Sequence, residues 1–235
     1  MNDSRIDILS NVSARENGLL KSVYSFMSLG LFVTAIVSYL ASRSPAVMNV
    51  FLRNPMGTLV LVFAQFGLVF YLSARIETMS RENAIIAFFA YSVLTGLSLS
   101  VIFLVYTASV IYQAFLSCAL MFGVTSIFAA TTKKNIASWG HYLTMALFGL
   151  IIASILNMFF RSNGMTMMIS LLGIIIFVGL TAWDTQKIVQ MNRRYGDVMS
   201  VDEYTKLGIL GALELYLDFI NIFLYLLRIF GNRRD

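Results

Sequence analysis

Seven apolar segments, each about 20 residues long, follow one another along this chain. An apolar helix of that length crosses the roughly 30 Å hydrocarbon core of a bilayer, because each residue adds about 1.5 Å. Only helices and closed barrels satisfy their backbone polar groups in lipid. The chain is therefore predicted to be an all-α membrane protein, a bundle of seven transmembrane helices over residues 22–41, 56–75, 84–106, 110–131, 140–160, 166–190 and 207–230.

Composition supports a membrane protein with one domain. Of the 235 residues, 58% are hydrophobic and 12% are charged, whereas a soluble domain has about 25% charged residues. Residues 1–21 carry several charges and no apolar core, so they predict a polar tail rather than a signal peptide. A single transmembrane domain over 22–235 follows, and the lone Cys118 excludes a disulfide framework.

The basic residues predict how the bundle is oriented. Cytoplasmic loops carry an excess of Lys and Arg. A cytoplasmic N-terminus puts most of the 17 Lys and Arg inside, and leaves outside only Arg43, Arg53, Arg161, Arg228, Arg233 and Arg234. The net charge of +5 therefore reflects membrane orientation, and the expected partner is the lipid bilayer, not a nucleic acid.

Two aspartates lie inside the predicted spans, Asp184 in the sixth and Asp218 in the seventh. A carboxylate in hydrocarbon costs about 2.5–3.5 kcal/mol and by default marks a functional site. Asp184 precedes Arg193 by roughly 13 Å of helix, and Asp218 follows Lys206 by roughly 18 Å. Because the two helices enter from the same side, the carboxylates are expected at nearly one depth.

Helical spacing extends each aspartate into a stripe of small or polar residues. Such a stripe faces the protein interior or a water-filled cavity, not lipid. We interpret its glycines and Thr181 as helix-packing residues and its acids as functional. The stripe of the seventh span contains Gly211, Glu214, Asp218, Asn221, Tyr225 and Arg228, and that of the sixth contains Gly173, Phe177, Thr181 and Asp184. Arg75 ends the second span on the same side, where its side chain can reach an acid or snorkel to the headgroups.

The segments GALELYLDFINIFLYLLRIFG and FVGLTAWDTQKI, with YSVLTGLSLS and ATTKKN, resemble the transmembrane Bax inhibitor motif family, above all its bacterial inner-membrane branch. The resemblance covers nearly the whole chain. It implies an inner-membrane protein in which one central helix is surrounded by the others, and a pH-dependent calcium leak. It also implies that Asp184 and Asp218 share a proton and that Arg75 latches the closed state.

Elementary electrostatics gives this implied activity a mechanism. Two carboxylates in contact cannot both ionise cheaply, so such a pair holds one proton, which keeps helices six and seven together. Loss of the proton creates repulsion and leaves hard oxygen ligands suited to calcium, with Glu214 as a third candidate ligand. We expect calcium and protons as transported or sensed ions, no cofactor and no enzymatic activity. The alternative is a non-transporting regulator of other membrane proteins, such as a membrane protease.

Other functions fit the sequence less well. A diaspartyl intramembrane protease, which would use such a pair for general acid–base hydrolysis, has GxGD where this chain has YLDF, and a serine intramembrane protease needs a GxSG that is absent. The lone His141 stands beside Trp139 at a helix start, as an interfacial residue does. A retinal protein needs a lysine within helix seven, whereas Lys206 stands at its mouth. The methionines near 165–168 have no Cys or His beside them, so they predict core packing rather than a metal site.

Overall fold

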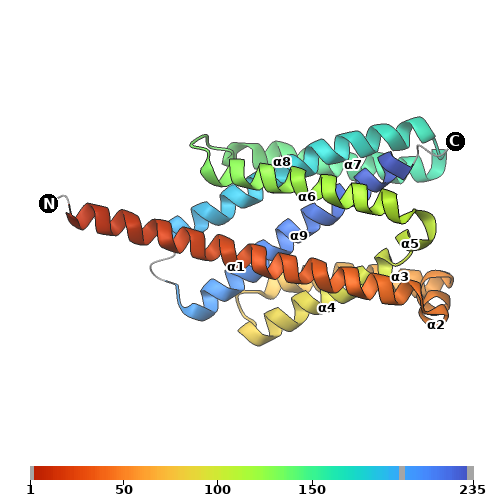
Figure 1. The fold of residues 1–235 in the computed structure, drawn as a ribbon, viewed down its shortest axis with the longest axis horizontal. Coiled ribbons are helices and arrows are strands. Elements are labelled where there is room, and N and C mark those ends of the chain that lie inside the picture. The colour runs from red at the N-terminus through yellow and green to blue at the C-terminus, as the bar shows by residue number, and fades with distance from the viewer. Residues whose placement is uncertain (1–2, 196–198, 232–235) are drawn as a thin grey trace. The chain divides into compact units, whose positions relative to one another are not determined.

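In the computed structural model, the backbone is described for residues 3–195 and 199–231, and side chains for residues 18–51, 53–194 and 199–231. Every regular element within the described backbone is helical (Figure 1). The elements are α1 (Asp3–Ser42), α2 (Pro45–Val47), the π-helix η1 (Met48–Leu52), α3 (Pro55–Arg75), α4 (Arg81–Leu99), α5 (Ile102–Val105), α6 (Ala108–Thr131), the 3₁₀-helix η2 (Ala137–Trp139), α7 (Gly140–Phe160), α8 (Asn163–Tyr195) and α9 (Val201–Gly231).

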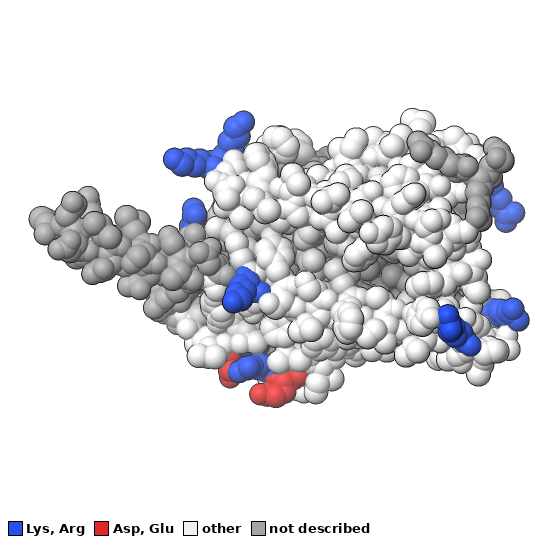
Figure 2. All heavy atoms as spheres, in the orientation of Figure 1, with Lys and Arg blue, Asp and Glu red and all other residues white. Residues whose placement is uncertain are grey.

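The prediction of seven spans is confirmed. Within the described residues, seven stretches of helix are long and apolar enough to cross a membrane: Gly18–Ser42, Pro55–Arg75, Arg81–Val105, Ala108–Thr131, Ala137–Phe160, Asn163–Arg194 and Val201–Gly231. Most of the described surface on the face drawn in Figure 2 is uncharged. Phenylalanines such as Phe66 and Phe70 are 72% and 75% exposed, which suits a lipid-facing helix. The cytoplasmic location of the N-terminus stays a prediction.

Local capping explains where several helices begin. Pro55 opens α3, where its missing N–H costs nothing, and the Asn54 side chain accepts a hydrogen bond from the Met56 N–H at 3.0 Å. The Ser80 hydroxyl accepts from the Asn83 N–H at 3.3 Å and caps α4. The helix of the first span already begins at Asp3, inside the predicted polar tail 1–21, and the tail as a separate region stays a prediction.

Between the sixth and seventh spans the sequence predicts a charged loop over 191–206, and this prediction is wrong in its extent. Helix α8 continues to Tyr195 and α9 begins at Val201. At the start of α9, Ser200 and Glu203 form a capping box: the Glu203 carboxylate accepts from the Ser200 N–H at 2.8 Å, and the Ser200 hydroxyl accepts from the Glu203 N–H at 3.3 Å. The charges that suggested a loop therefore lie largely on the last turn of one helix and the first turns of the next.

The third predicted span, 84–106, is also interrupted. Helix α4 ends at Leu99, and the short α5 begins at Ile102. Both the backbone N–H and the hydroxyl of Ser100 donate to the Leu97 carbonyl, at 3.3 and 2.6 Å. A serine that bonds its own backbone in this way competes with the regular helix ladder. The break therefore comes from a local hydrogen bond, with no proline or glycine at the point of interruption.

The chain divides into two compact units. The first contains residues 1–105 and 188–213, and the second contains residues 106–187 and 214–235. Helices α8 and α9 each contribute to both units, so neither unit is a continuous segment of the chain. The prediction of a single transmembrane domain over 22–235 stays a prediction.

In the first unit, α1 and α4 pack closely through small residues. A Cβ built on Gly96 would lie 2.8 Å from the Thr34 carbonyl oxygen. The Thr34 hydroxyl in turn donates to the Ser92 carbonyl at 2.9 Å. Small residues that let two backbones approach, with a hydroxyl bonded across the interface, are the usual means of helix association in lipid.

In the second unit, α9 packs against α6 through aromatic rings and a thiol. The Phe219 ring makes edge contacts with Phe115 and Phe122, at centroid distances of 5.8 and 5.6 Å. The Cys118 thiol donates to the Phe219 carbonyl oxygen at 3.4 Å. Among the seven spans, that of α9 has the largest buried share, 61%, against 6% for Ala137–Phe160. The helix that carries Asp218 is thus the most buried of the seven.

Candidate functional site

The two predicted stripes face each other within the second unit. A Cβ built on Gly173 of α8 would lie 2.5 Å from the ring of Tyr225 on α9, and the Phe177 and Tyr225 rings are 6.0 Å apart. Further along α8, the Thr181 side chain hydrogen-bonds with the Asp218 carboxyl group. Residue numbers rise on α8 as they fall on α9, so the two helices pack antiparallel with their small and polar residues inside.

The Asp218 carboxyl group is deeply buried and has too few hydrogen-bond partners to be stable as an ion. Its residue is 4% exposed, and its Oδ2 atom has no hydrogen-bond partner among the described residues. An ionised oxygen without a partner in a low-dielectric interior is strongly unfavourable. The carboxyl group therefore needs one further partner, which a bound proton or a cation would supply.

Asp184 lies close enough to Asp218 for the two carboxyl groups to interact electrostatically, and Glu214 acts on both. Asp184 is 7% exposed. The three acids that the sequence pattern singles out are therefore neighbours. Within the described residues, however, no three His, Cys, Asp or Glu side chains are arranged closely enough to hold a metal ion. The role of Glu214 as a calcium ligand stays a prediction.

Lys187 stands among these acids, although the sequence pattern does not single it out. Its Nζ atom is 2.6 Å from Glu214 Oε1 and 4.0 Å from Asp184 Oδ1. The same ammonium group lies 5.3 Å from the centroid of the Trp183 ring, within the range of a cation–π contact. The signal in the sequence is its place three residues after Asp184, which puts both on one face of α8.

The turn of α8 that carries Asp184 is braced from outside the pair. The Gln186 side chain donates to the Lys134 carbonyl at 2.8 Å and accepts from the Ile136 N–H at 2.6 Å. Trp183 packs against Gly140, where any Cβ would collide with its ring. The connection after α6 and the start of α7 thus hold the Asp184 turn in place.

Three further residues belong to the predicted site, namely Arg75, Gly211 and Asn221. Arg75 ends α3 in the first unit and is exposed, and its role as a latch stays a prediction. Gly211, also in the first unit, is a packing position, because a Cβ there would lie 2.8 Å from Ile188 Cδ1. The Asn221 amide donates to the Leu217 carbonyl of its own helix at 2.8 Å. The apolar side of α9 is buried as well, for example at Tyr216.

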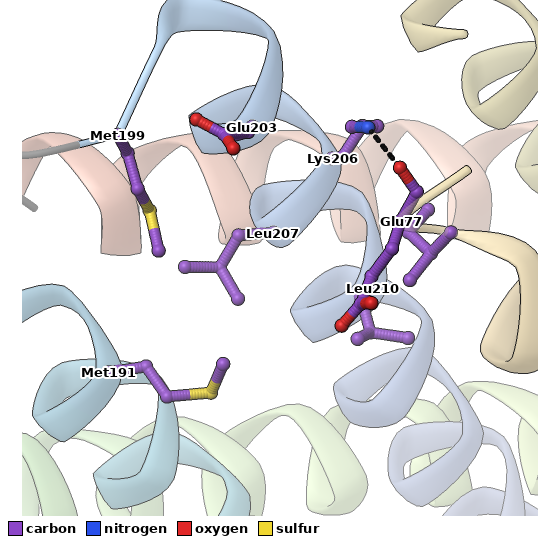
Figure 3. Close-up of a pocket in the computed structure, with 8 residues that line it drawn as sticks. Glu77, Met191, Met199, Glu203, Lys206, Leu207 and Leu210 are labelled. Carbon is purple, nitrogen blue, oxygen red and sulfur yellow. Dashed lines mark hydrogen bonds between the residues drawn. The ribbon is translucent and has the colours of Figure 1, made fainter. Parts of the chain in front are cut away.

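A separate cavity of about 320 Å³ lies in the first unit (Figure 3). Lys206 stands at its edge and donates to the backbone carbonyls of Glu77 and Met79, at 2.9 and 3.4 Å. The cavity is lined by Ile76, Glu77, Met191, Met199, Glu203, Lys206, Leu207 and Leu210. None of these residues belongs to the acid pair.

Comparisons with known proteins agree along nearly the whole chain. A family model described as "Inhibitor of apoptosis-promoting Bax1" matches residues 16–235. The Escherichia coli K12 protein named "Inner membrane protein YbhL" is 45% identical over 215 residues, which cover 92% of each chain. An uncharacterized protein of Borreliella burgdorferi is 40% identical over 220 residues, 94% of each chain. The uncharacterized protein YrjE of Lactococcus lactis is 37% identical over 240 residues, 98% of this chain and 97% of its own.

Proposed function

Because the chain belongs to the Bax inhibitor-1 family, whose model matches residues 16–235, we propose that it is a pH-sensitive calcium leak of a bacterial inner membrane. The location follows the name of its Escherichia coli relative, an inner membrane protein, and the seven apolar spans. The single observation that carries the activity is the buried Asp218 beside Asp184, with one carboxyl oxygen left without a partner among the described residues.

The burial of Asp218 beside a second acid supports a proton on this pair. The Thr181 hydroxyl donates to the Phe177 carbonyl at 2.8 Å and also contacts the Asp218 carboxyl group, but the Asp218 Oδ2 atom has no partner among the described residues. Two ionised carboxylates in contact would be unfavourable in such a buried position. The closed state is therefore assigned one proton on the pair.

Deprotonation opens the pathway in this proposal. The pair holds its proton at low pH and loses it as pH rises, and the second ionisation places two like charges on facing helices. Repulsion between Asp184 and Asp218 then separates α8 from α9. The same ionised oxygens become ligands for Ca²⁺, which prefers carboxylates. Leak consequently increases with cytoplasmic pH, in a single titration that belongs to the pair.

Arg75 is assigned the latch of the closed state, as the family resemblance implies. If its guanidinium bonds Asp184 in the closed state, Arg75→Ala removes a charge-assisted hydrogen bond and loosens the gate. The variant is then expected to leak more calcium at low pH and to respond less steeply to pH. Wild-type flux at every pH would leave Arg75 a snorkelling interfacial residue.

The test is calcium flux through the purified protein in liposomes that contain a calcium-sensitive dye, measured over a series of external pH values. A leak that rises with pH supports the proposal. A folded protein that conducts no calcium at any pH would contradict it. The non-transporting regulator would then be the better assignment, and capture of a membrane-protein partner would become the relevant assay.

A further inference from the structure

The acid cluster of α8 and α9 already contains a cation that belongs to the protein. Lys187 bonds Glu214 at 2.6 Å and faces Asp184 at 4.0 Å. Calcium binds carboxylate oxygens at about 2.3–2.6 Å. A divalent cation shared by these two carboxylates would have to lie between them, and it would displace the ammonium group from Glu214.

We propose that Lys187 is a tethered counter-ion that occupies this cation position and restricts it to divalent ions. The inference rests on the proposed function, since it concerns how calcium enters that same acid cluster. Asp218, on the next turn of α9 from Glu214, adds an observation beyond the ion pair itself, because its buried Oδ2 has no partner among the described residues and so needs a proton or a cation.

The Lys187 side chain can move away from the carboxylates and still have favourable surroundings. Its side chain is 34% exposed, more than those of Asp184 and Glu214, at 10% and 26%. Lysine presents a point charge on a flexible stem and lacks the rigid two-pronged contact of arginine. The Trp183 ring, 5.3 Å from Nζ, offers the displaced ammonium a second favourable surface. A displaced Lys187 ammonium group therefore still lies beside the Trp183 ring and remains partly exposed, so it does not enter an apolar environment.

Counting charges explains the selectivity. With Asp184 and Glu214 ionised, Lys187 neutralises only one of the two negative charges. A monovalent ion that replaces the ammonium gains no neutralisation and must compete with a group already held at the site. A divalent ion neutralises both charges and so gains electrostatic energy that the monovalent ion does not. Lys187 thus favours Ca²⁺ over Na⁺ or K⁺ by occupying the site.

Cation binding tests this inference without any flux measurement. Tb³⁺, a luminescent substitute for Ca²⁺, would be sensitised by Trp183 when it replaces the Lys187 ammonium, and Trp139→Phe removes the other of the two tryptophans as background. Lys187→Met keeps the aliphatic stem and deletes the charge. In that background it should tighten Tb³⁺ binding, competed by Ca²⁺, by roughly tenfold and permit Na⁺ to compete. Lys187→Arg keeps the charge and adds a two-pronged contact with the carboxylates, so it should bind Tb³⁺ no more tightly than the parent protein, whereas the distant Lys206→Met should bind as the parent does.

A second measurement uses the unmodified chain. Calcium should expose the displaced amine, so acetylation of Lys187, read by mass spectrometry, should accelerate on calcium addition while that of Lys206 does not. Unchanged or weaker cation binding in folded Lys187→Met, or acetylation of Lys187 that ignores calcium, would overturn the inference. A different outcome would contradict the proposed function alone. In that case cations would bind and release Lys187, but liposomes would show no pH-dependent leak.

Discussion

Two polar regions of the α8–α9 pair use charge in opposite ways. At the first turns of α9, Glu203 caps the helix with Ser200, and Lys206 donates to the backbone carbonyls of Glu77 and Met79. In the acid cluster, Lys187 binds carboxylates instead, and Asp218 keeps an oxygen with no partner among the described residues. At the start of α9, charged side chains satisfy backbone hydrogen-bonding groups. In the acid cluster, a buried carboxyl oxygen stays without a partner among the described residues.

The difference separates structural charges from functional ones. A charged group that serves backbone N–H and C=O groups at a helix end is satisfied in the folded protein and has little left for a ligand. A charged group buried against other acids is unfavourable until a proton or cation joins it. Amide and apolar substitutions should therefore affect transport in the acid cluster and only stability at the start of α9.

The largest effect is expected for Asp218→Asn compared with Glu203→Gln. Both changes replace a carboxylate by its amide. The first removes the charge that binds calcium and the group that exchanges the proton, so we expect calcium flux to fall by tenfold or more, roughly 1.4 kcal/mol, and its pH response to flatten. Glu203→Gln should leave flux and its pH midpoint at wild-type values in the liposome assay.

This comparison would break if Asp218→Asn, shown by size-exclusion chromatography to be folded, kept both the wild-type flux and the wild-type pH midpoint. Asp218 would then be structural, as Glu203 is. Asp184→Asn is a less clean probe, because it also changes the environment of Lys187, which lies 4.0 Å away.

The largest effect on stability, rather than on flux, is expected at the packing that brings the acids together. Gly173→Ala places a Cβ against the Tyr225 ring, so α8 and α9 must separate or the ring must move, and overpacking of this kind costs about 1–3 kcal/mol. Gly149→Ala on α7 is the matched control, because nothing lies within 4 Å of its new methyl group. Thermal unfolding in detergent should show a lower midpoint for Gly173→Ala alone. Equal midpoints would mean that the two stripes do not depend on close contact.

Sequence patterns predict the seven spans and the opposition of the two stripes because both depend on local properties. The length of an apolar run decides whether it can cross a bilayer. Likewise, the three-and-four spacing around Asp184 and Asp218 decides which side chains share a face. Their meeting in the structure needs only that α8 and α9 be adjacent and antiparallel.

The features that sequence patterns do not predict depend on partners far along the chain. Gln186 is held by the backbone at Lys134 and Ile136, a connection that no spacing within α8 reveals. Lys187 is recognisable as an i+3 neighbour of Asp184, but its stronger contact, with Glu214, requires the packed pair of helices. The loop predicted at 191–206 is a different kind of error, because the Ser200–Glu203 capping box was available in the sequence and outweighs the signal from the charges.

A smaller effect is expected for Lys206→Met. The substitution removes two hydrogen bonds to the carbonyls that follow α3, and because the site is partly exposed we expect a loss of about 1 kcal/mol in stability. Calcium flux and Tb³⁺ binding should not change. The unfolding midpoint in detergent and the liposome assay together test this, and an altered pH response would show that Lys206 belongs with Lys187 rather than with the structural group.

The smallest effect is expected for Ser200→Ala, which deletes one half of the capping box at the start of α9. The Glu203 N–H loses its acceptor at 3.3 Å, and loss of an N-cap side chain costs about 0.5–1 kcal/mol. Only the first turn of α9 should loosen, because later turns keep their own hydrogen bonds. Hydrogen exchange should accelerate at the amides of 201–204 and stay unchanged around Asp218, and Ser200→Asp, which restores an acceptor, should reverse it. Faster exchange that reached Asp218 would mean that the two polar regions open together, and the separation between structural and functional charges would no longer hold.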